Sequence, residues 1–487
     1  MFWNKKKAPE LSAPSGIGAA DFAGAGTPLK FNSVDFRDGQ QSLFATRLTT
    51  ADMIPLLEQM DAVGYDSMEM WGGATFDVAV RFLKDDPWER VRTFKKYVKK
   101  TPLKMVLRGQ NLVGYKAYPD DVVEAFIAQA AEAGIDVFLT FDALQDLRNC
   151  ETAFKAIKKA GKKIEGSVQY NVSPFHTTEV FVQNALEQEQ MGASLMHVED
   201  MAGLMTPEAA YELITALKKA LKIPVHLHCH CTGGMAEMAY WEAIRAGVDG
   251  LDVCVSSMSM GPSLPPIESY LAALKGTSRD PKIDLGQFAD INKKFAELRR
   301  KYADFGTKLV GVDVGCLQHQ IPGGMLSNLT SQLKEQHAED KFYDVLEEVP
   351  RVRKDLGEPP LVTPSSQIVG TQAVFNVLMG ERYKMVTKET KDILLGKYGA
   401  TVKPFNPEVQ KKCIGDEKPI TCRPADLLDN ELEKLESEMA QYKEQDEDVL
   451  TYALFPQVAM DFFKYRQAQK TKVDEKAADK KNGAYPV

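Results

Sequence analysis

The sequence predicts an α/β protein in which a (β/α)8 TIM barrel is followed by an α-helical carboxyl-terminal domain. Three observations support this fold class. Eight short runs of apolar and β-branched residues follow one another along the first half of the chain. The segments between the runs have helical patterning, and the helical pattern continues after the eighth run without further strands. Eight successive strand and helix units are what a closed parallel barrel requires.

The predicted strands are short and are separated by segments long enough to hold a helix each. They cover residues 30–36, 67–71, 104–107, 136–141, 163–170, 194–198, 224–230 and 250–255. Strands that are joined through helices run parallel. We therefore expect all eight carboxyl ends at one rim of the barrel.

The helices between the strands carry boundary signals in the sequence. Thr49, Pro119 and Thr206 precede helical segments. Acidic residues follow in the first turn of these segments, at the positive end of the helix dipole. A glycine closes the helical segment before several strands, as is usual at helix carboxyl ends. These glycines are Gly64, Gly134, Gly192 and Gly247.

The chain is long enough for the barrel and a second domain. It has 487 residues, and a barrel of about 250 residues uses roughly half of them. We expect an amino-terminal tail over residues 1–28, the barrel over 29–275, a helical domain over 285–469 and a disordered tail over 470–487. A polar linker over residues 275–284 separates the two domains in this division.

Composition excludes several classes of protein. The net charge is −8, and no predicted element carries a basic stripe, so a nucleic-acid surface is not expected. No apolar run reaches the roughly 18 residues that span a bilayer, and the first residues lack the apolar core of a secretion signal. The seven cysteines are scattered, which is typical of reduced thiols. We expect a cytoplasmic protein without transmembrane segments.

Reactive side chains fall at the carboxyl ends of several predicted strands, where barrels of this class carry their sites. Asp38 follows the first strand, Glu199 closes the sixth, and His228 and His230 close the seventh. Two histidines at i and i+2 of a strand project to one face, here the barrel lumen. Closure of the barrel brings the first and last strands together, so these four side chains could bind one divalent ion. The sequence therefore predicts a site for Zn²⁺, Mn²⁺ or Co²⁺.

Other residues near the histidine pair have different expected roles. His226 shares the face of His228 but lies deeper in the barrel, where a hydrogen-bonded core residue is favoured over a metal ligand. Cys229 and Cys231 alternate with the histidines and are expected to point away from them.

Arg37, Gln41 and Arg108 flank the same rim. A guanidinium group can hold a carboxylate through two hydrogen bonds. We therefore predict that these residues bind an anionic substrate and that the two arginines assist catalysis; the alternative is that an arginine only ties loops together. A metal beside an arginine suits a 2-oxo acid, because the ion polarises the carbonyl while the arginine holds the carboxylate.

Motifs along most of the chain resemble the biotin-dependent carboxyltransferase family. They are FRDGQQSLFATR, WGGATFD, LRGQNLVGY, FDALQDLRN, HVEDMAGLMTP, HLHCHCTGGM, HQIPGGMLSNL, RPAD and TYALFPQV. The family includes the oxaloacetate decarboxylase α subunit, the pyruvate carboxylase carboxyltransferase domain and the transcarboxylase subunit that acts on pyruvate. The resemblance implies a funnel-like helical domain over the barrel. It also places Asp38, His228 and His230 on metal-ligand positions, and Arg37, Gln41 and Arg108 on substrate-contacting positions.

Two positions depart from the family motif. Glu199 stands where the family has a lysine that is carboxylated to bridge to the metal. Pro262 stands where the family has a threonine that relays a proton, and proline has no hydroxyl group. The chain also lacks the Ala-Met-Lys-Met sequence around a biotinylated lysine, so the resemblance implies a biotin carrier on another polypeptide.

The expected function is carboxyl transfer to, or decarboxylation of, a 2-oxo acid such as oxaloacetate or pyruvate. The expected partners are a biotin carboxyl carrier subunit and further copies or subunits of a carboxylase or decarboxylase assembly. Two alternatives remain open at this point: a biotin-independent, metal-dependent lyase or aldolase, and a catalytically altered structural subunit of a carboxylase complex.

Overall fold

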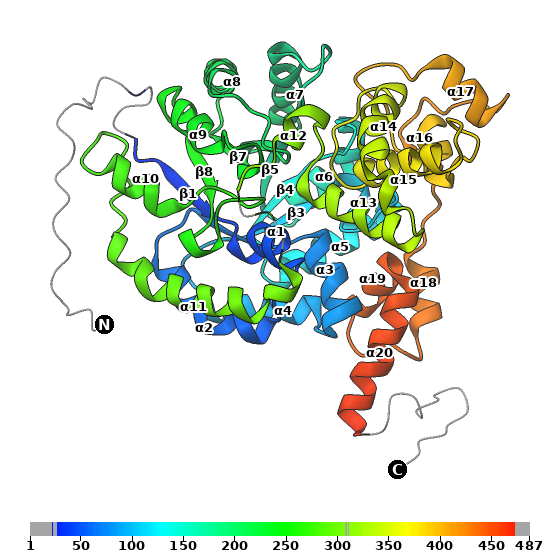
Figure 1. Ribbon diagram of the computed structural model, residues 1–487. Helices are drawn as coiled ribbons and strands as arrows, with labels where there is room; N and C mark the ends of the chain where they lie inside the picture. The colour runs from blue at the N-terminus through cyan, green and yellow to red at the C-terminus, as the bar shows by residue number, and fades with distance from the viewer. Residues whose placement is uncertain (1–21, 23–26, 307–308, 310, 473–487) are drawn as a thin grey trace.

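Eight parallel strands close into a barrel in the structure, a computed structural model that describes residues 22, 27–306, 309 and 311–472 (Figure 1). The strands are β1 (Lys30–Ser33), β2 (Ser67–Trp71), β3 (Leu103–Leu107), β4 (Val137–Thr140), β5 (Lys163–Gln169), β6 (Leu195–Asp200), β7 (Val225–Cys229) and β8 (Gly250–Val253). Each strand pairs with the next, and β8 pairs with β1. The predicted (β/α)8 barrel is confirmed.

The first strand is shorter than its predicted run of 30–36. It ends at Ser33 because the chain turns at Asp35–Gly39 into a single π-helical turn, η2. In that turn the backbone N–H groups of Arg37 and Gly39 both donate to the carbonyl of Val34, at 3.2 and 3.0 Å. The turn continues into α1 (Gln40–Phe44) and fixes the backbone that carries Arg37 and Asp38.

Helices surround the barrel as the sequence predicts. They are α2 (Thr50–Ala62), α3 (Gly73–Val78), α4 (Pro87–Tyr97), α5 (Asp120–Ala133), α6 (Glu151–Lys159), α7 (Thr178–Met191), α8 (Pro207–Ala220), α9 (Ala236–Arg245) and α10 (Ile267–Leu274). Thr49 and Thr206 cap α2 and α8 with their side chains. Gly134 and Gly192 close α5 and α7 with φ of 129° and 115°, a region that side chains with a Cβ rarely adopt.

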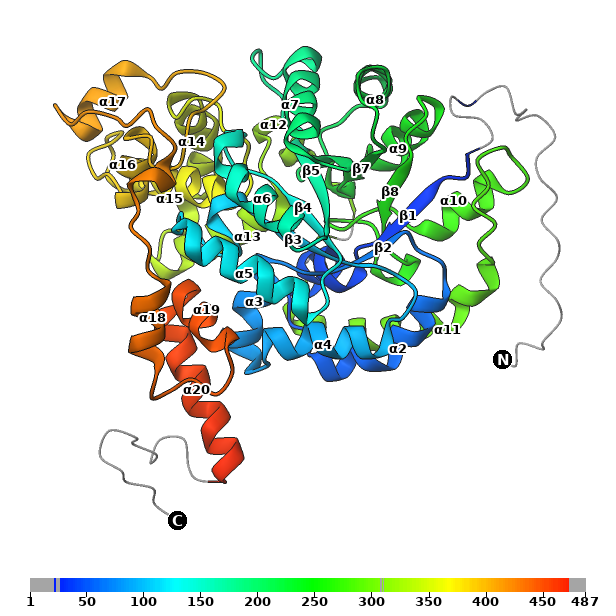
Figure 2. The same cartoon turned by 180° about the vertical axis from the view of Figure 1, so that it is seen from behind.

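A helical region follows the barrel and packs in two places (Figures 1 and 2). It comprises α11 (Phe288–Lys301), α12 (Val314–His319), α13 (Gly323–Glu335), α14 (Phe342–Asp355), α15 (Ser365–Leu378), α16 (Lys388–Leu394), α17 (Pro407–Ile414), α18 (Leu432–Met439), α19 (Glu447–Leu454) and α20 (Pro456–Thr471). Apolar side chains of α13 to α17 share a core of their own. Those of α11 and of α18 to α20 belong to the barrel core.

Contacts of aromatic residues show how the last helices join the barrel. Trp88 of α4 donates from Nε1 to Oγ1 of Thr451 in α19, at 2.9 Å. The ring of Phe455 lies 5.9 Å from the ring of Phe76.

The expected linker over 275–284 also lies against the barrel, since buried Arg279 donates to the carbonyl of Val248. Of the two expected tails, residues 1–21, 23–26 and 473–487 lie outside the described residues.

The lumen of the barrel is unusually polar. Lumens of this class are filled mainly by branched apolar side chains, whereas here charged and polar groups from seven of the eight strands are buried and contact one another. They are Asn32, Glu69, Lys104, Glu165, His197, His226, His228 and Asp252. In the described part of the chain, no helix combines the length and the apolar character that crossing a membrane requires.

Candidate active site

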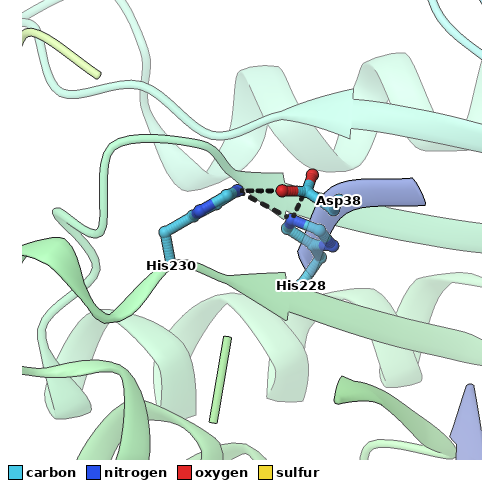
Figure 3. Close-up of side chains that lie close together, drawn as sticks. All are labelled: Asp38, His228 and His230. Atoms are coloured by element: carbon cyan, nitrogen blue, oxygen red, sulfur yellow. Dashed lines mark hydrogen bonds and ion pairs between the residues drawn. The ribbon is translucent and has the colours of Figure 1, made fainter. Parts of the chain in front are cut away.

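Asp38, His228 and His230 point toward one another at the carboxyl-terminal rim of the barrel (Figure 3). Nε2 of His228 lies 3.1 Å from Nε2 of His230. Oδ2 of Asp38 lies 3.7 Å from Nε2 of His228, and Oδ1 lies 3.6 Å from Nε2 of His230. All three side chains are buried, and one ligand atom from each lies within 4.8 Å of the others. The structure thus brings together three of the four predicted ligands.

Hydrogen bonds on the far side of each ring determine which nitrogen faces the site. Nδ1 of His230 lies 2.7 Å from the carbonyl oxygen of Pro262, and Nδ1 of His228 lies 3.0 Å from Oδ2 of Asp252. A carbonyl and an ionised carboxylate only accept, so both rings carry a proton on Nδ1. In the neutral form of each ring, Nε2 then presents its lone pair to the site.

The donor set therefore fits a divalent cation. Two imidazole lone pairs and a carboxylate converge from three sides, and repulsion between these acceptors is relieved when a cation lies among them. Each ring is also held from behind by a hydrogen-bond acceptor, as is usual for metal-binding histidines. Mixed nitrogen and oxygen ligands suit Zn²⁺, Mn²⁺ or Co²⁺.

The charge of Asp38 is stabilised despite its burial. Burial alone would raise the pKa of this carboxyl group, but the guanidinium of Arg37, together with His230 and His228 in their protonated forms, outweighs it and holds the pKa well below its usual range. Nη1 of Arg37 lies 2.7 Å from Oδ2 of Asp38. The Nε of Arg37 donates to Glu69 of β2, so Arg37 is fixed by two acidic residues at the edge of the site.

Glu199, the fourth predicted ligand, lies on the strand next to His228, but its carboxylate forms a hydrogen bond with Gln169. In the barrel its Cα pairs with that of His228 on one side and with that of Gln169 on the other. Nε2 of Gln169 donates to Oε2 of Glu199 at 2.7 Å. Sequence reasoning missed Gln169, although its position at the end of a predicted strand was a usable signal.

A cavity of about 660 Å³ opens above these residues. From the barrel its lining includes Arg37, Asp38, Gln41, Arg108, Glu199, His230 and Pro262. From the helical region it includes Met325, Leu326, Leu361 and Val362. All predicted site residues except His228 thus line one cavity, and His228 reaches it through its contacts with Asp38 and His230.

Arg108 is a buried cation in this cavity. Its Nη1 donates to the carbonyl of Gly114 at 2.5 Å, and its guanidinium lies 5.5 Å from the ring centre of Tyr115. Among the described residues no carboxylate forms an ion pair with it, and burial lowers its pKa. A buried guanidinium without an acidic partner favours an anionic ligand.

Gly73 makes room for Arg108, because a Cβ built at position 73 would lie 1.7 Å from Nη2 of Arg108. We expect Gly73→Ala to displace the guanidinium and to raise KM for an anionic substrate by about tenfold or more, the loss of one charged hydrogen bond. Steady-state kinetics would measure this. Gly323→Ala is the matched control, because its Cβ would lie at an ordinary 3.6 Å from Pro262 in the same cavity. Equal KM values for the two variants would contradict the prediction.

The remaining expectations for the histidine strand are confirmed. His226 is a core residue whose Nδ1 lies 3.1 Å from Nδ2 of Asn32 and 3.2 Å from Oε1 of Glu165. Cys229 turns away from the histidines, and its Sγ lies 3.3 Å from Oδ2 of Asp200.

Comparisons with known proteins agree with the motifs. A family model described as "HMGL-like" matches residues 28–294, and one described as "Conserved carboxylase domain" matches residues 316–484. A pyruvate carboxylase subunit of Methanocaldococcus jannaschii is 52% identical over 440 residues, which span 90% of this chain and 78% of that protein. The methylmalonyl-CoA carboxyltransferase 5S subunit of Propionibacterium freudenreichii is 51% identical over 88% of this chain and 86% of that protein.

The fold also matches a solved structure. The carboxyl transferase domain of Rhizobium etli pyruvate carboxylase with pyruvate and biocytin has a TM-score of 0.87 and 32% identity, and the match covers 93% of this chain and 79% of that one. The two sequence relatives are more than 50% identical to this chain and are matched over most of their own length, which is enough to assign the family. The chain belongs to the biotin-dependent carboxyltransferase family of enzymes.

Proposed function

We propose that this protein transfers a carboxyl group between biotin, carried by a separate subunit, and a 2-oxo acid such as pyruvate or oxaloacetate. The observation that carries the proposal is the convergence of Asp38, His228 and His230 at a cavity that the buried guanidinium of Arg108 also lines. Relatives named as a pyruvate carboxylase subunit, and the similar structure with pyruvate and biocytin, support the substrate class.

In this proposal, different residues of the chain bind the metal, orient the substrate and cover the cavity. Asp38, His228 and His230 hold a divalent ion, which when bound polarises the carbonyl of the oxo acid. Arg108 and Arg37 orient the carboxylate of the substrate, and Gln41 lines the same side. Glu199 adds a carboxylate near the metal at a place fixed by its bond to Gln169. Domain 285–469 covers the mouth of the barrel. Its apolar side chains Met325, Leu326 and Val362 line the cavity and limit the access of water to it.

Carboxyl exchange tests the proposal. Purified protein loaded with Zn²⁺, Mn²⁺ or Co²⁺ would be incubated with labelled pyruvate, oxaloacetate and free biocytin, and the label in oxaloacetate would be measured. We expect exchange that requires both the metal and biocytin. Metal-dependent loss of oxaloacetate without biocytin would instead support a lyase. Absence of both reactions, with either substrate, would overturn the proposal and favour a structural subunit.

Pro262 offers a second test, because its carbonyl holds His230 while its side chain provides no hydroxyl group. We expect Pro262→Thr to raise the exchange rate by at least about tenfold, since a positioned acid or base contributes about 10²–10⁴-fold. Pro262→Val is the matched control, with the same shape as threonine and no hydroxyl. Equal rates for the threonine and valine variants would show that the hydroxyl group has no role here.

A further inference from the structure

We propose that Lys104 is a positioning residue which, through Glu69 and Asp252, links the substrate-binding Arg37 to the metal-binding His228. One buried ammonium group would then fix both halves of the site. The proposal rests on the proposed function only for the roles of Arg37 and His228. The contacts that connect them lie in the lumen, below the cavity.

Lys104 stands in β3 with three carboxylates around its ammonium group. Nζ lies 3.3 Å from Oε2 of Glu165, 3.6 Å from Oε2 of Glu69 and 3.6 Å from Oδ1 of Asp252. All four side chains are fully buried. These contacts are ion pairs at longer range than a direct hydrogen bond, so Lys104 acts on the three carboxylates through its charge. Burial alone would lower the pKa of Lys104, but the carboxylates outweigh it and hold the pKa above its usual value, so the group is charged.

Glu69 connects Lys104 to Arg37. Its Oε2 faces Lys104, and its Oε1 accepts a hydrogen bond from Nε of Arg37. The second side of the Arg37 guanidinium pairs with Asp38. The position of Arg37 in the cavity is therefore set by one carboxylate that Lys104 holds and by one that belongs to the metal site.

Asp252 connects Lys104 to His228. Its Oδ1 faces Lys104 and accepts from Nδ2 of Asn32 at 2.9 Å. Its Oδ2 accepts from Nδ1 of His228 and from Nε2 of His197, both at 3.0 Å. The bond to His228 holds the ring with Nε2 turned toward Asp38 and His230, so Asp252 orients a proposed metal ligand.

His197, His228 and Asp252 also lie close enough together to be considered as a metal site. The ammonium of Lys104 lies beside Asp252, however, and a second cation would be repelled by it at short range. The three groups are better explained as a hydrogen-bonded support for the first site, with Lys104 as the cation that neutralises it.

Glu165 provides an internal comparison. It has the same charge and burial as Glu69 and Asp252, and it lies nearest to Lys104. Its other oxygen pairs with His226, a core residue with no contact to Arg37 or His228 among the described interactions. Loss of its charge should disturb the cluster without disturbing the path from Arg37 to His228.

The experiment compares Lys104→Gln, Glu165→Gln and the double variant Lys104→Gln/Glu165→Gln. Metal affinity would be measured by competition with a chelator, KM with pyruvate or oxaloacetate, and folding by thermal unfolding. We expect Lys104→Gln to weaken metal binding by about 10–100-fold, the usual effect of losing a group behind a ligand, and to raise KM. For Glu165→Gln, we expect the metal affinity and KM to stay within about threefold of the parent values, which is less than the loss of a contact at the site would cause.

The double variant separates positioning from stability. It removes one positive and one negative charge together, so it should unfold at a higher temperature than Lys104→Gln while its metal affinity stays low. Parental metal affinity in Lys104→Gln, recovery of affinity in the double variant, or equal effects of Lys104→Gln and Glu165→Gln would each overturn the inference. If the parent protein itself binds no metal, the proposed function fails instead.

Discussion

Replacing His230 by alanine should leave the purified protein without its divalent metal and lower carboxyl exchange by about a thousandfold. The expected size follows from the several kcal/mol that a metal contributes to charge stabilisation, since each 1.36 kcal/mol of barrier is about tenfold in rate. His230 supplies one of two imidazole nitrogens in the site, and its loss leaves two protein ligands. Elemental analysis and the exchange assay would measure the two effects.

His226→Gln is the control for that result. His226 lies in β7, four residues before His230, and is fully buried, but it contacts Asn32 and Glu165 rather than the site. We expect the variant to be less stable and to keep its metal. Stoichiometric metal in His230→Ala, or equal loss from both variants, would contradict the assigned ligand set.

Arg108→Ala should raise KM for the oxo acid by about a hundredfold, because truncating one partner of a buried charge pair costs about 2–5 kcal/mol. The metal content should not change, since Arg108 contacts Gly114 and Tyr115 and none of the three proposed ligands. Steady-state kinetics and elemental analysis on the same preparation would check both statements.

Arg108→Lys gives a sharper version of this test. Lysine keeps the charge but loses the planar pair of donors that grips a carboxylate. We expect it to recover only part of the lost affinity. If Arg108→Ala had the same KM as the parent protein, the substrate carboxylate would have to bind elsewhere.

Much of the fold could be predicted because strand and turn signals in this sequence are local. Each of the eight predicted runs overlaps an observed strand. The threonines expected at helix starts, Thr49 and Thr206, cap their helices, and the glycines expected at helix ends, Gly134 and Gly192, close theirs. The turn at Asp35–Gly39 was not predicted, since its geometry depends on two N–H groups sharing the carbonyl of Val34. The return of α18 to α20 to the barrel core is a tertiary contact, which no periodicity reveals.

The site could be predicted in part for a related reason. The alternation of β7 and closure of the barrel were enough to expect Asp38, His228 and His230 together. They could not show that Gln169 would hold Glu199, because that bond depends on the register of β5 with β6. The support beneath the site was missed as well, although Lys104 within an apolar run was a signal that its charge must be neutralised in the lumen.

Anomalous diffraction from crystals of the protein with its metal would test the central claim most directly. At the absorption edge of the ion found by elemental analysis, we predict one strong peak that lies about 2.0–2.2 Å from Nε2 of His228, Nε2 of His230 and a carboxylate oxygen of Asp38. A protein saturated with Zn²⁺, Mn²⁺ or Co²⁺ that shows its peak elsewhere, with these three side chains bonded only to one another, would contradict it.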